Sequence, residues 1–186
     1  MIKKSFPLIA LAVSAGLFSA TSSAITGTSS VQATFTSTIE AGTCTTQIQN
    51  ASGQQISTLA FGDVFKSDLV AQTRSEPFKI AFSGCAGVKS ATIQATKGTG
   101  GSCSGAALTG DSFAAGHETG FEVWKGTAGT GTLLSCKTMP VQNVTLSGAT
   151  ANVDMAARIV IASGKTIADV TTGDVSAPVT FVVTYQ

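Results

Sequence analysis

Charged side chains are scarce in this sequence. Only 11% of its 186 residues are Asp, Glu, Lys or Arg, and 11 basic against 10 acidic residues give a net charge of +1. Soluble domains usually carry about 25% charged residues. The sequence holds no cluster of Lys or Arg that could bind nucleic-acid phosphates or an anionic membrane. We therefore expect no nucleic-acid partner.

Histidine is almost absent, and this argues against catalysis and metal binding. The single histidine, His117, stands between Gly116 and Glu118 in a glycine-rich stretch, which predicts a solvated loop. Catalytic triads and most metal sites need histidine, and no CxxC, HExxH or GxSxG motif occurs. We expect no catalytic residues, no metal and no cofactor. The single tryptophan, Trp124, is expected in the core.

Apolar residues are abundant by contrast. They make up 43% of the chain, and the mean hydropathy is +0.33. A chain of this composition buries a core and is not intrinsically disordered. The length indicates a single domain.

The first 24 residues have the pattern of a secretory signal peptide. Lys3 and Lys4 precede an apolar run from Phe6 to Ala20, and small residues follow up to Ala24. A membrane anchor is the alternative, but the run is shorter than the roughly 20 residues that span a bilayer. We expect cleavage after Ala24 and no membrane span in the remainder.

Export changes how the cysteines are interpreted. Four cysteines, Cys44, Cys85, Cys103 and Cys136, form an even set. An oxidising compartment permits disulfides between them. Four cysteines allow three pairings, and loop-closure entropy alone does not choose among them.

Short β-prone runs separated by Gly, Ser, Asn and Asp are typical of an all-β sandwich. The expected strands are Gln55–Phe61, Phe78–Phe82, Ala91–Thr96, Gly120–Lys125, Val141–Leu146, Ala156–Ala162 and Val175–Tyr185. One helical turn is expected over Phe65–Gln72. A glycine-rich loop, Lys97–Gly110, contains Cys103.

Both ends of the exported chain alternate between apolar and polar residues with a period of two. At the C-terminus, the apolar positions are Val175, Ala177, Val179, Phe181, Val183 and Tyr185. Ahead of the first cysteine, the corresponding face consists of Val31, Ala33, Phe35, Ser37 and Ile39. Each segment could be an ordinary strand of one sandwich. Alternatively, the N-terminal segment is an arm that adds a strand to a neighbouring molecule.

Several separate motifs resemble the chaperone–usher fimbrial subunits, in particular the type 1 major pilins. Tyr185 matches a penultimate aromatic residue, and Gly173, the fourteenth residue counted back from Gln186, matches a family glycine. The segment from Ala33 to Cys44 resembles a donor strand that leads into the first cysteine. Two further segments, Leu59–Val64 and Pro77–Cys85, resemble the middle of such a subunit.

The resemblance implies an incomplete immunoglobulin-like β-sandwich that lacks its last strand and is completed by donor-strand exchange. Residues 25–43 would be the donor arm and residues 44–186 the pilin domain. Gly173 and the alternating residues up to Tyr185 would line the groove that a chaperone first occupies. The implied disulfides are Cys44–Cys85 and Cys103–Cys136, the second of which many relatives lack. Ser37 departs from the family, whose donor strands usually carry glycine there.

The implied function is structural and not enzymatic. We expect a subunit that polymerises into a fimbrium on the bacterial surface and supports adhesion. Its partners would be a periplasmic chaperone, an outer-membrane usher and other pilin subunits. Alternatives are a minor adaptor pilin of the same fibre and a periplasmic binding protein. A tip adhesin is disfavoured, because such adhesins carry an extra lectin domain and lack a donor arm.

Overall fold

The computed structural model describes residues 32–186. The expected signal peptide, residues 1–24, lies outside the described residues, as do residues 25–31 of the expected arm, including Val31. The chain divides into two units, one ending at Thr38 and the other covering Ile39–Gln186. Each unit is described by itself.

The second unit is built almost entirely of strands. Its elements in chain order are β1 (Thr43–Asn50), α1 (Lys66–Ala71), β2 (Ser75–Ala86), β3 (Ser90–Lys97), β4 (Phe113–Gly116), β5 (Thr119–Lys125), β6 (Thr132–Leu133), β7 (Gln142–Thr145), β8 (Ala151–Ile161) and β9 (Val179–Tyr185). The expected all-β class is therefore confirmed.

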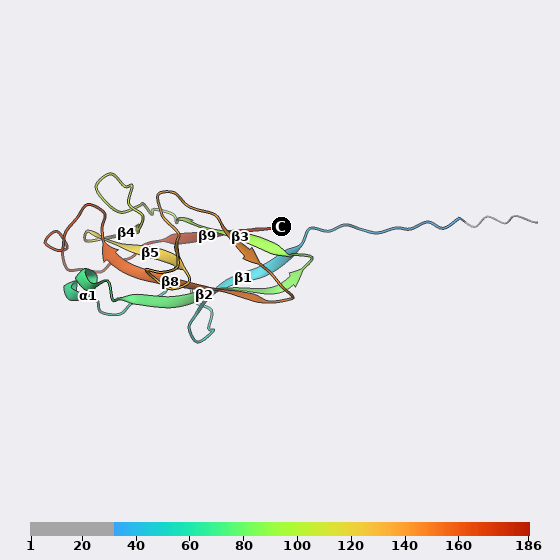
Figure 1. Ribbon diagram of the computed structural model, residues 1–186, viewed down its shortest axis with the longest axis horizontal. Helices are drawn as coiled ribbons and strands as arrows, with labels where there is room; N and C mark the ends of the chain where they lie inside the picture. The colour runs from blue at the N-terminus through green and yellow to red at the C-terminus, as the bar shows by residue number, and fades with distance from the viewer. Residues whose placement is uncertain (1–31) are drawn as a thin grey trace, which may run out of the picture. The chain divides into compact units, whose positions relative to one another are not determined.

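The strands form two antiparallel sheets. The larger has the order β1-β2-β8-β5-β4, with β6 paired to β5, and the smaller has the order β7-β3-β9. Figure 1 shows β3 and β9 in one layer and β2 and β8 in the other. Neither sheet closes on itself, so each has edge strands, among them β1 in the larger sheet and β9 in the smaller.

The core lies between the two sheets. Alternate residues of the central strands point inward, since successive side chains in a strand face opposite sides. Fully buried core residues include Ile80, Phe82, Ile93, Phe113 and Leu134. A second, smaller cluster joins Leu69 of α1 to Ile159 of β8 and to Val170.

The helical turn occurs where the sequence predicts it. Phe65 is the N-cap and Gln72 the C-cap of α1. The Phe65 backbone N–H donates to Asp68 Oδ2 at 2.9 Å, which satisfies one of the amides left free at a helix start. Gln72 ends the helix in the left-handed conformation, with φ 52°.

Most predicted strands are present with shifted ends. The runs Phe78–Phe82, Ala91–Thr96 and Gly120–Lys125 lie within β2, β3 and β5. The run Val141–Leu146 contains β7, and Ala156–Ala162 overlaps β8, which begins earlier, at Ala151. Partners on both sides extend β8, because it pairs with β2 along its first part and with β5 along its second.

Two strand predictions are wrong in part or in full. Over Gln55–Phe61, only Gln55 forms an isolated bridge, to Gln49, and the chain then leaves the sheet. The Phe61 carbonyl accepts hydrogen bonds from the Arg74 side chain instead of a neighbouring strand. The last strand begins at Val179 and not at Val175. It starts directly after Pro178, which has no N–H to donate to a ladder.

The placement of Trp124 in the core is also wrong. Its neighbour Val123 on β5 faces the core, so Trp124 points to the outer face of the larger sheet, where it is half-buried. The Arg158 guanidinium lies over the indole ring, 5.4 Å from its centroid, and pairs with Glu122 at 2.7 Å. The Arg158 guanidinium, held by its ion pair with Glu122, therefore covers this ring through a cation–π contact, and the ring does not pack in the core.

Candidate strand-docking site

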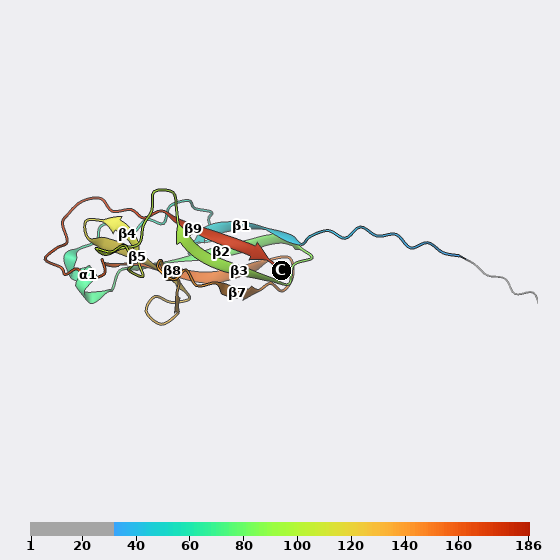
Figure 2. The ribbon, with the colours of Figure 1, turned by 90° about the horizontal axis from the view of Figure 1, so that it is seen from above.

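Strand β9 forms one edge of the smaller sheet. It pairs with β3 over seven positions, from Ala91 opposite Tyr185 to Lys97 opposite Val179. In the order β7-β3-β9, no strand from residues 32–186 pairs with its other side. In Figure 2, β9 lies beside β3 and between it and β1 in projection. An edge strand of this kind presents unpaired backbone N–H and C=O groups.

The apolar residues predicted to share one face at the C-terminus do alternate in burial. Val175, Ala177, Val179, Phe181, Val183 and Tyr185 are half-buried, and every residue between them is exposed. Four of these, Val179 to Tyr185, lie on β9 and pack against the main core. None of the six is fully buried. This face is therefore only partly covered by the protein's own strands.

Strand β1 is the edge strand of the larger sheet that faces β9. The Tyr185 hydroxyl lies 2.5 Å from Thr46 Oγ1 and donates to the Cys44 carbonyl at 2.9 Å, so the ends of the two strands meet there. Phe181 contacts Phe78, with ring centroids 5.8 Å apart, and Phe78 pairs with Asn50 at the other end of β1. The two edge strands therefore run in opposite directions.

Strand β1 is not among the strands predicted from the sequence. Its inward positions Cys44, Thr46 and Ile48 alternate with polar residues, but only Ile48 is strongly apolar. A period of two is present in Thr43–Asn50, and it could have indicated a strand. Thr46 matters to the site because its hydroxyl contacts Tyr185.

Gly173 lies in the segment that leads to β9. Its φ of 151° is one that residues with a side chain rarely adopt. A Cβ at this position would collide with the imidazole ring of His117. His117 is exposed, as expected, and its Nδ1 lies 2.8 Å from Thr171 Oγ1. The backbone conformation therefore favours glycine here, and a side chain at this position would also displace the exposed His117 ring.

The described part of the expected donor arm has no strand structure. Residues 32–42 are assigned neither helix nor strand, and 32–41 are exposed. The side chains of Phe35 and Ile39 are 94% and 98% exposed. Ala33 and Ser37 share this exposure.

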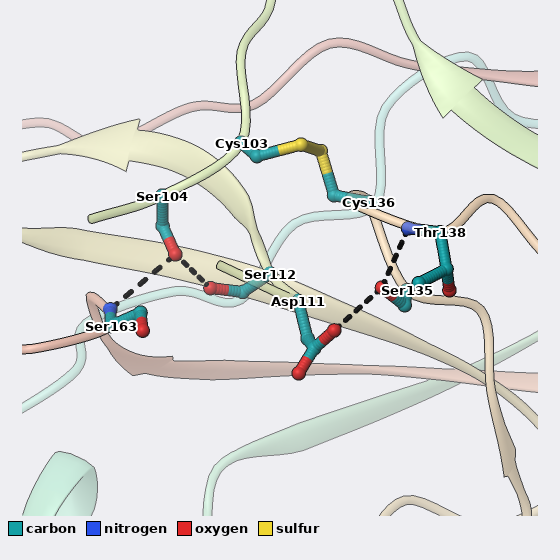
Figure 3. Close-up of a disulfide and its surroundings, with 8 residues drawn as sticks. All are labelled: Cys103, Ser104, Asp111, Ser112, Ser135, Cys136, Thr138 and Ser163. Carbon is teal, nitrogen blue, oxygen red and sulfur yellow. Dashed lines mark hydrogen bonds between the residues drawn. A yellow bond between two sulfur atoms is a disulfide. The ribbon is translucent and has the colours of Figure 1, made fainter. Parts of the chain in front are cut away.

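Both disulfides expected from the resemblance are present. Cys44–Cys85 joins β1 to β2, and Cys103–Cys136 holds the glycine-rich loop against the core. Figure 3 shows the second disulfide beside a polar network. Ser104 Oγ lies 2.6 Å from Ser112 Oγ, and Ser135 donates to Asp111 at 2.6 Å. Buried hydroxyls that are all hydrogen-bonded cost little stability, so the loop is firmly held.

The described residues offer little for other kinds of site. Within 32–186, no group of three or more His, Cys, Asp or Glu side chains is arranged to hold a metal ion. The same residues include no helix long and apolar enough to cross a bilayer. A shallow hollow of about 640 Å³ is lined by residues of β5, β6, β7 and β8. At this hollow, Lys125 Nζ donates to the Asn143 carbonyl at 2.8 Å.

Comparison with known proteins identifies the family. The family model described as fimbrial protein matches residues 33–186. The chain is 40% identical over 189 residues to the "Uncharacterized fimbrial-like protein YadL" of Escherichia coli strain K12, covering 94% of this chain and 92% of YadL.

Two solved structures share the fold. The crystal structure of the P pilus rod subunit PapA matches with a TM-score of 0.51 at 22% identity, covering 77% of this chain and 99% of PapA. A chaperone–usher pilus structure that concerns rod uncoiling matches with a TM-score of 0.53 at 22% identity, covering 85% and 96%. The sandwich is therefore the immunoglobulin-like fold of such pilins. The chain belongs to the fimbrial protein family, whose members are structural subunits and not enzymes.

Proposed function

We propose that this protein is a polymerising subunit of a chaperone–usher fimbria, and that its open β9 edge receives the N-terminal arm of the next subunit. The observation that carries this proposal is the incomplete burial of β9. Its inward side chains pack on the core yet remain half-buried, at an edge with no second strand. An additional strand at this edge would pair the free backbone groups and cover these side chains.

The arm has the complementary pattern. Ala33, Phe35 and Ile39 alternate with polar residues, as an inserted strand requires. Burial of a side chain the size of Phe35 or Ile39 contributes about 1.5–3 kcal/mol before ordering costs. Ser37 lies between them and is small, which suits the position where family donor strands carry glycine.

The direction of the added strand follows from the fold. In an immunoglobulin-like sandwich, the last strand pairs antiparallel to the strand before it. The arm would therefore run antiparallel to β9, with Ile39 near Val179 and Ala33 near the Tyr185 end. Because arm and edge are different surfaces, the contact between copies does not close on itself and generates an open fibre.

The cellular setting follows from the same scheme. An open apolar edge aggregates unless it is covered. A periplasmic chaperone would cover β9 after export, and an outer-membrane usher would replace it with the arm of the next subunit. The finished fimbrium would lie on the cell surface and support adhesion.

Deleting residues 29–39 tests the proposal most directly. The shortened chain should still fold and bind its chaperone, because the recipient edge is intact, but it should not extend a fibre. Negative-stain imaging of cells that express the whole operon measures fibre length. Fibres of normal length from this variant would overturn the proposal.

A second test supplies the arm within one chain. Residues 27–42 are appended after Gln186 through a short flexible linker, so that the arm can fold back onto β9. The result should be a monomer with a higher thermal midpoint than the unmodified chain. A matched chain in which the appended copies of Phe35 and Ile39 are Asp should show no increase.

A further inference from the structure

We propose that Tyr185 is a positioning residue, whose hydroxyl ties β9 to β1 and thereby sets the spacing into which the arm inserts. This inference rests on the proposed function. The Tyr185 hydroxyl would fix the distance between two strands, whereas the other inward residues of β9 contribute apolar surface.

The hydroxyl makes two hydrogen bonds to the opposite sheet. It donates to the Cys44 carbonyl at 2.9 Å, and it lies 2.5 Å from Thr46 Oγ1. A phenol has one proton, so the bond to the Cys44 carbonyl leaves the Thr46 hydroxyl as the donor of the second bond. Both groups belong to β1, and both bonds are partly buried. They are therefore less exposed to competition from water than a surface pair.

The tie connects four strands. The Tyr185 backbone pairs with Ala91 of β3, and Cys44 is bridged to Cys85 of β2. The Tyr185 ring also meets the Phe82 ring edge-on, with centroids 6.5 Å apart. Because these neighbours belong to both sheets, moving β9 away from β1 would disturb the core at this end.

The other end of β9 is held to the larger sheet in a different way. There, Phe181 contacts Phe78 through ring packing alone, and among residues 32–186 no side-chain hydrogen bond joins Val179 or Phe181 to β1. A hydrogen bond weakens steeply when its distance or angle changes, so it constrains the separation of the groups that it joins. The spacing between the edge strands is thus defined at the Tyr185 end. If the arm lies antiparallel to β9, its N-terminal half lies at the Tyr185 end, so that half must fit between the two strands at this spacing.

The test separates arm binding from the stability of the subunit. Full-length chains carry Phe35→Asp and Ile39→Asp so that their own arms cannot dock. A labelled synthetic peptide of residues 27–42 is titrated onto them, and fluorescence anisotropy gives its Kd. Thermal unfolding without peptide is measured in parallel.

The variants are Tyr185→Phe, which removes only the hydroxyl, Thr46→Val, which removes its partner, and the double variant. Thr184→Val serves as control, because Thr184 is exposed on the outer face.

We expect Tyr185→Phe to weaken peptide binding about three- to tenfold, the range for one net hydrogen bond. Thr46→Val removes only one of the two bonds and should weaken binding by a smaller factor, and the double variant should be no weaker than Tyr185→Phe alone. Thr46→Ser, which keeps a hydroxyl, should bind like wild type. Without peptide, Tyr185→Phe should lower the midpoint of thermal unfolding relative to Thr184→Val, because the hydroxyl makes both hydrogen bonds in the subunit without an arm.

Unchanged peptide affinity in Tyr185→Phe would overturn the inference, whether or not the midpoint without peptide is lower. A wild-type chain that does not bind the peptide would instead overturn the proposed function itself.

Discussion

Strands β3 and β9 lie side by side and carry similar patterns, yet they are covered very differently. On β3, the inward residues Ala91, Ile93 and Ala95 are 0%, 1% and 0% exposed. On β9, the inward residues from Val179 to Tyr185 all remain half-buried. The cause is position, because among residues 32–186 β3 pairs with β7 and β9, whereas β9 pairs with β3 alone. Burial of an apolar face thus depends on the neighbours of a strand as well as on its own sequence.

The largest effect should come from the fully covered strand. Ile93→Ala removes a side chain that is 1% exposed and leaves a cavity in the core. The free energy of unfolding should fall by about 2–5 kcal/mol. Denaturant unfolding should show the same loss in the unmodified chain and in the chain with the appended arm. A loss seen in only one of the two chains would contradict the comparison.

Phe181→Ala is the matching change on β9, and its effect should depend on the arm. Phe181 is half-buried in the described structure, so truncation should cost roughly 1–2 kcal/mol in the unmodified chain. In the chain with the appended arm, the loss should rise toward about 3–5 kcal/mol, the range for a buried phenylalanine. The difference between the two denaturation curves is the measured quantity. Equal losses would mean that the arm does not cover Phe181.

Gly173→Ala tests the segment that leads to β9. The added methyl group would collide with the His117 ring and force alanine into an unfavourable φ of 151°. The free energy of unfolding should fall by roughly 1–3 kcal/mol. Adding His117→Ala removes the collision and should restore part of the loss, while the backbone strain remains. Full restoration would show that the backbone conformation carries no cost.

The smallest effect should come from the outer face of β9. Val182 is 44% exposed and is flanked by the inward residues Phe181 and Val183. Val182→Thr should change the free energy of unfolding by less than about 0.5 kcal/mol, with or without the appended arm. A larger loss in the complemented chain alone would indicate that the arm reaches the outer face as well.

Sequence reasoning succeeded where a pattern is local. The helical turn at Phe65–Gln72 and the strand over Ala91–Thr96 depend on residues close together in the chain, and both are present. The strand predicted over Gln55–Phe61 is wrong. There, the Phe61 carbonyl accepts a hydrogen bond from the Arg74 side chain and not from a neighbouring strand. Sequence reasoning also placed Trp124 in the core, since the sequence alone does not show which face of β5 looks inward.

The candidate site shows the same division. Alternation from Val175 to Tyr185 was evident from the residues, and the structure has the matching alternation of burial. Thr46 was not identified, because a threonine in a polar segment gives no sign that a tyrosine far along the chain contacts it. The roles of the arm residues Ala33, Phe35, Ser37 and Ile39 remain predictions.

The amino-acid sequence by itself determined the all-β class, the family and the apolar face of the last strand, because each depends on residue type and spacing. The tertiary structure alone decided that β1 faces β9 and that the Tyr185 hydroxyl joins the two strands. These features depend on which strands become neighbours. That choice is made by packing between segments distant in sequence, which no local pattern records.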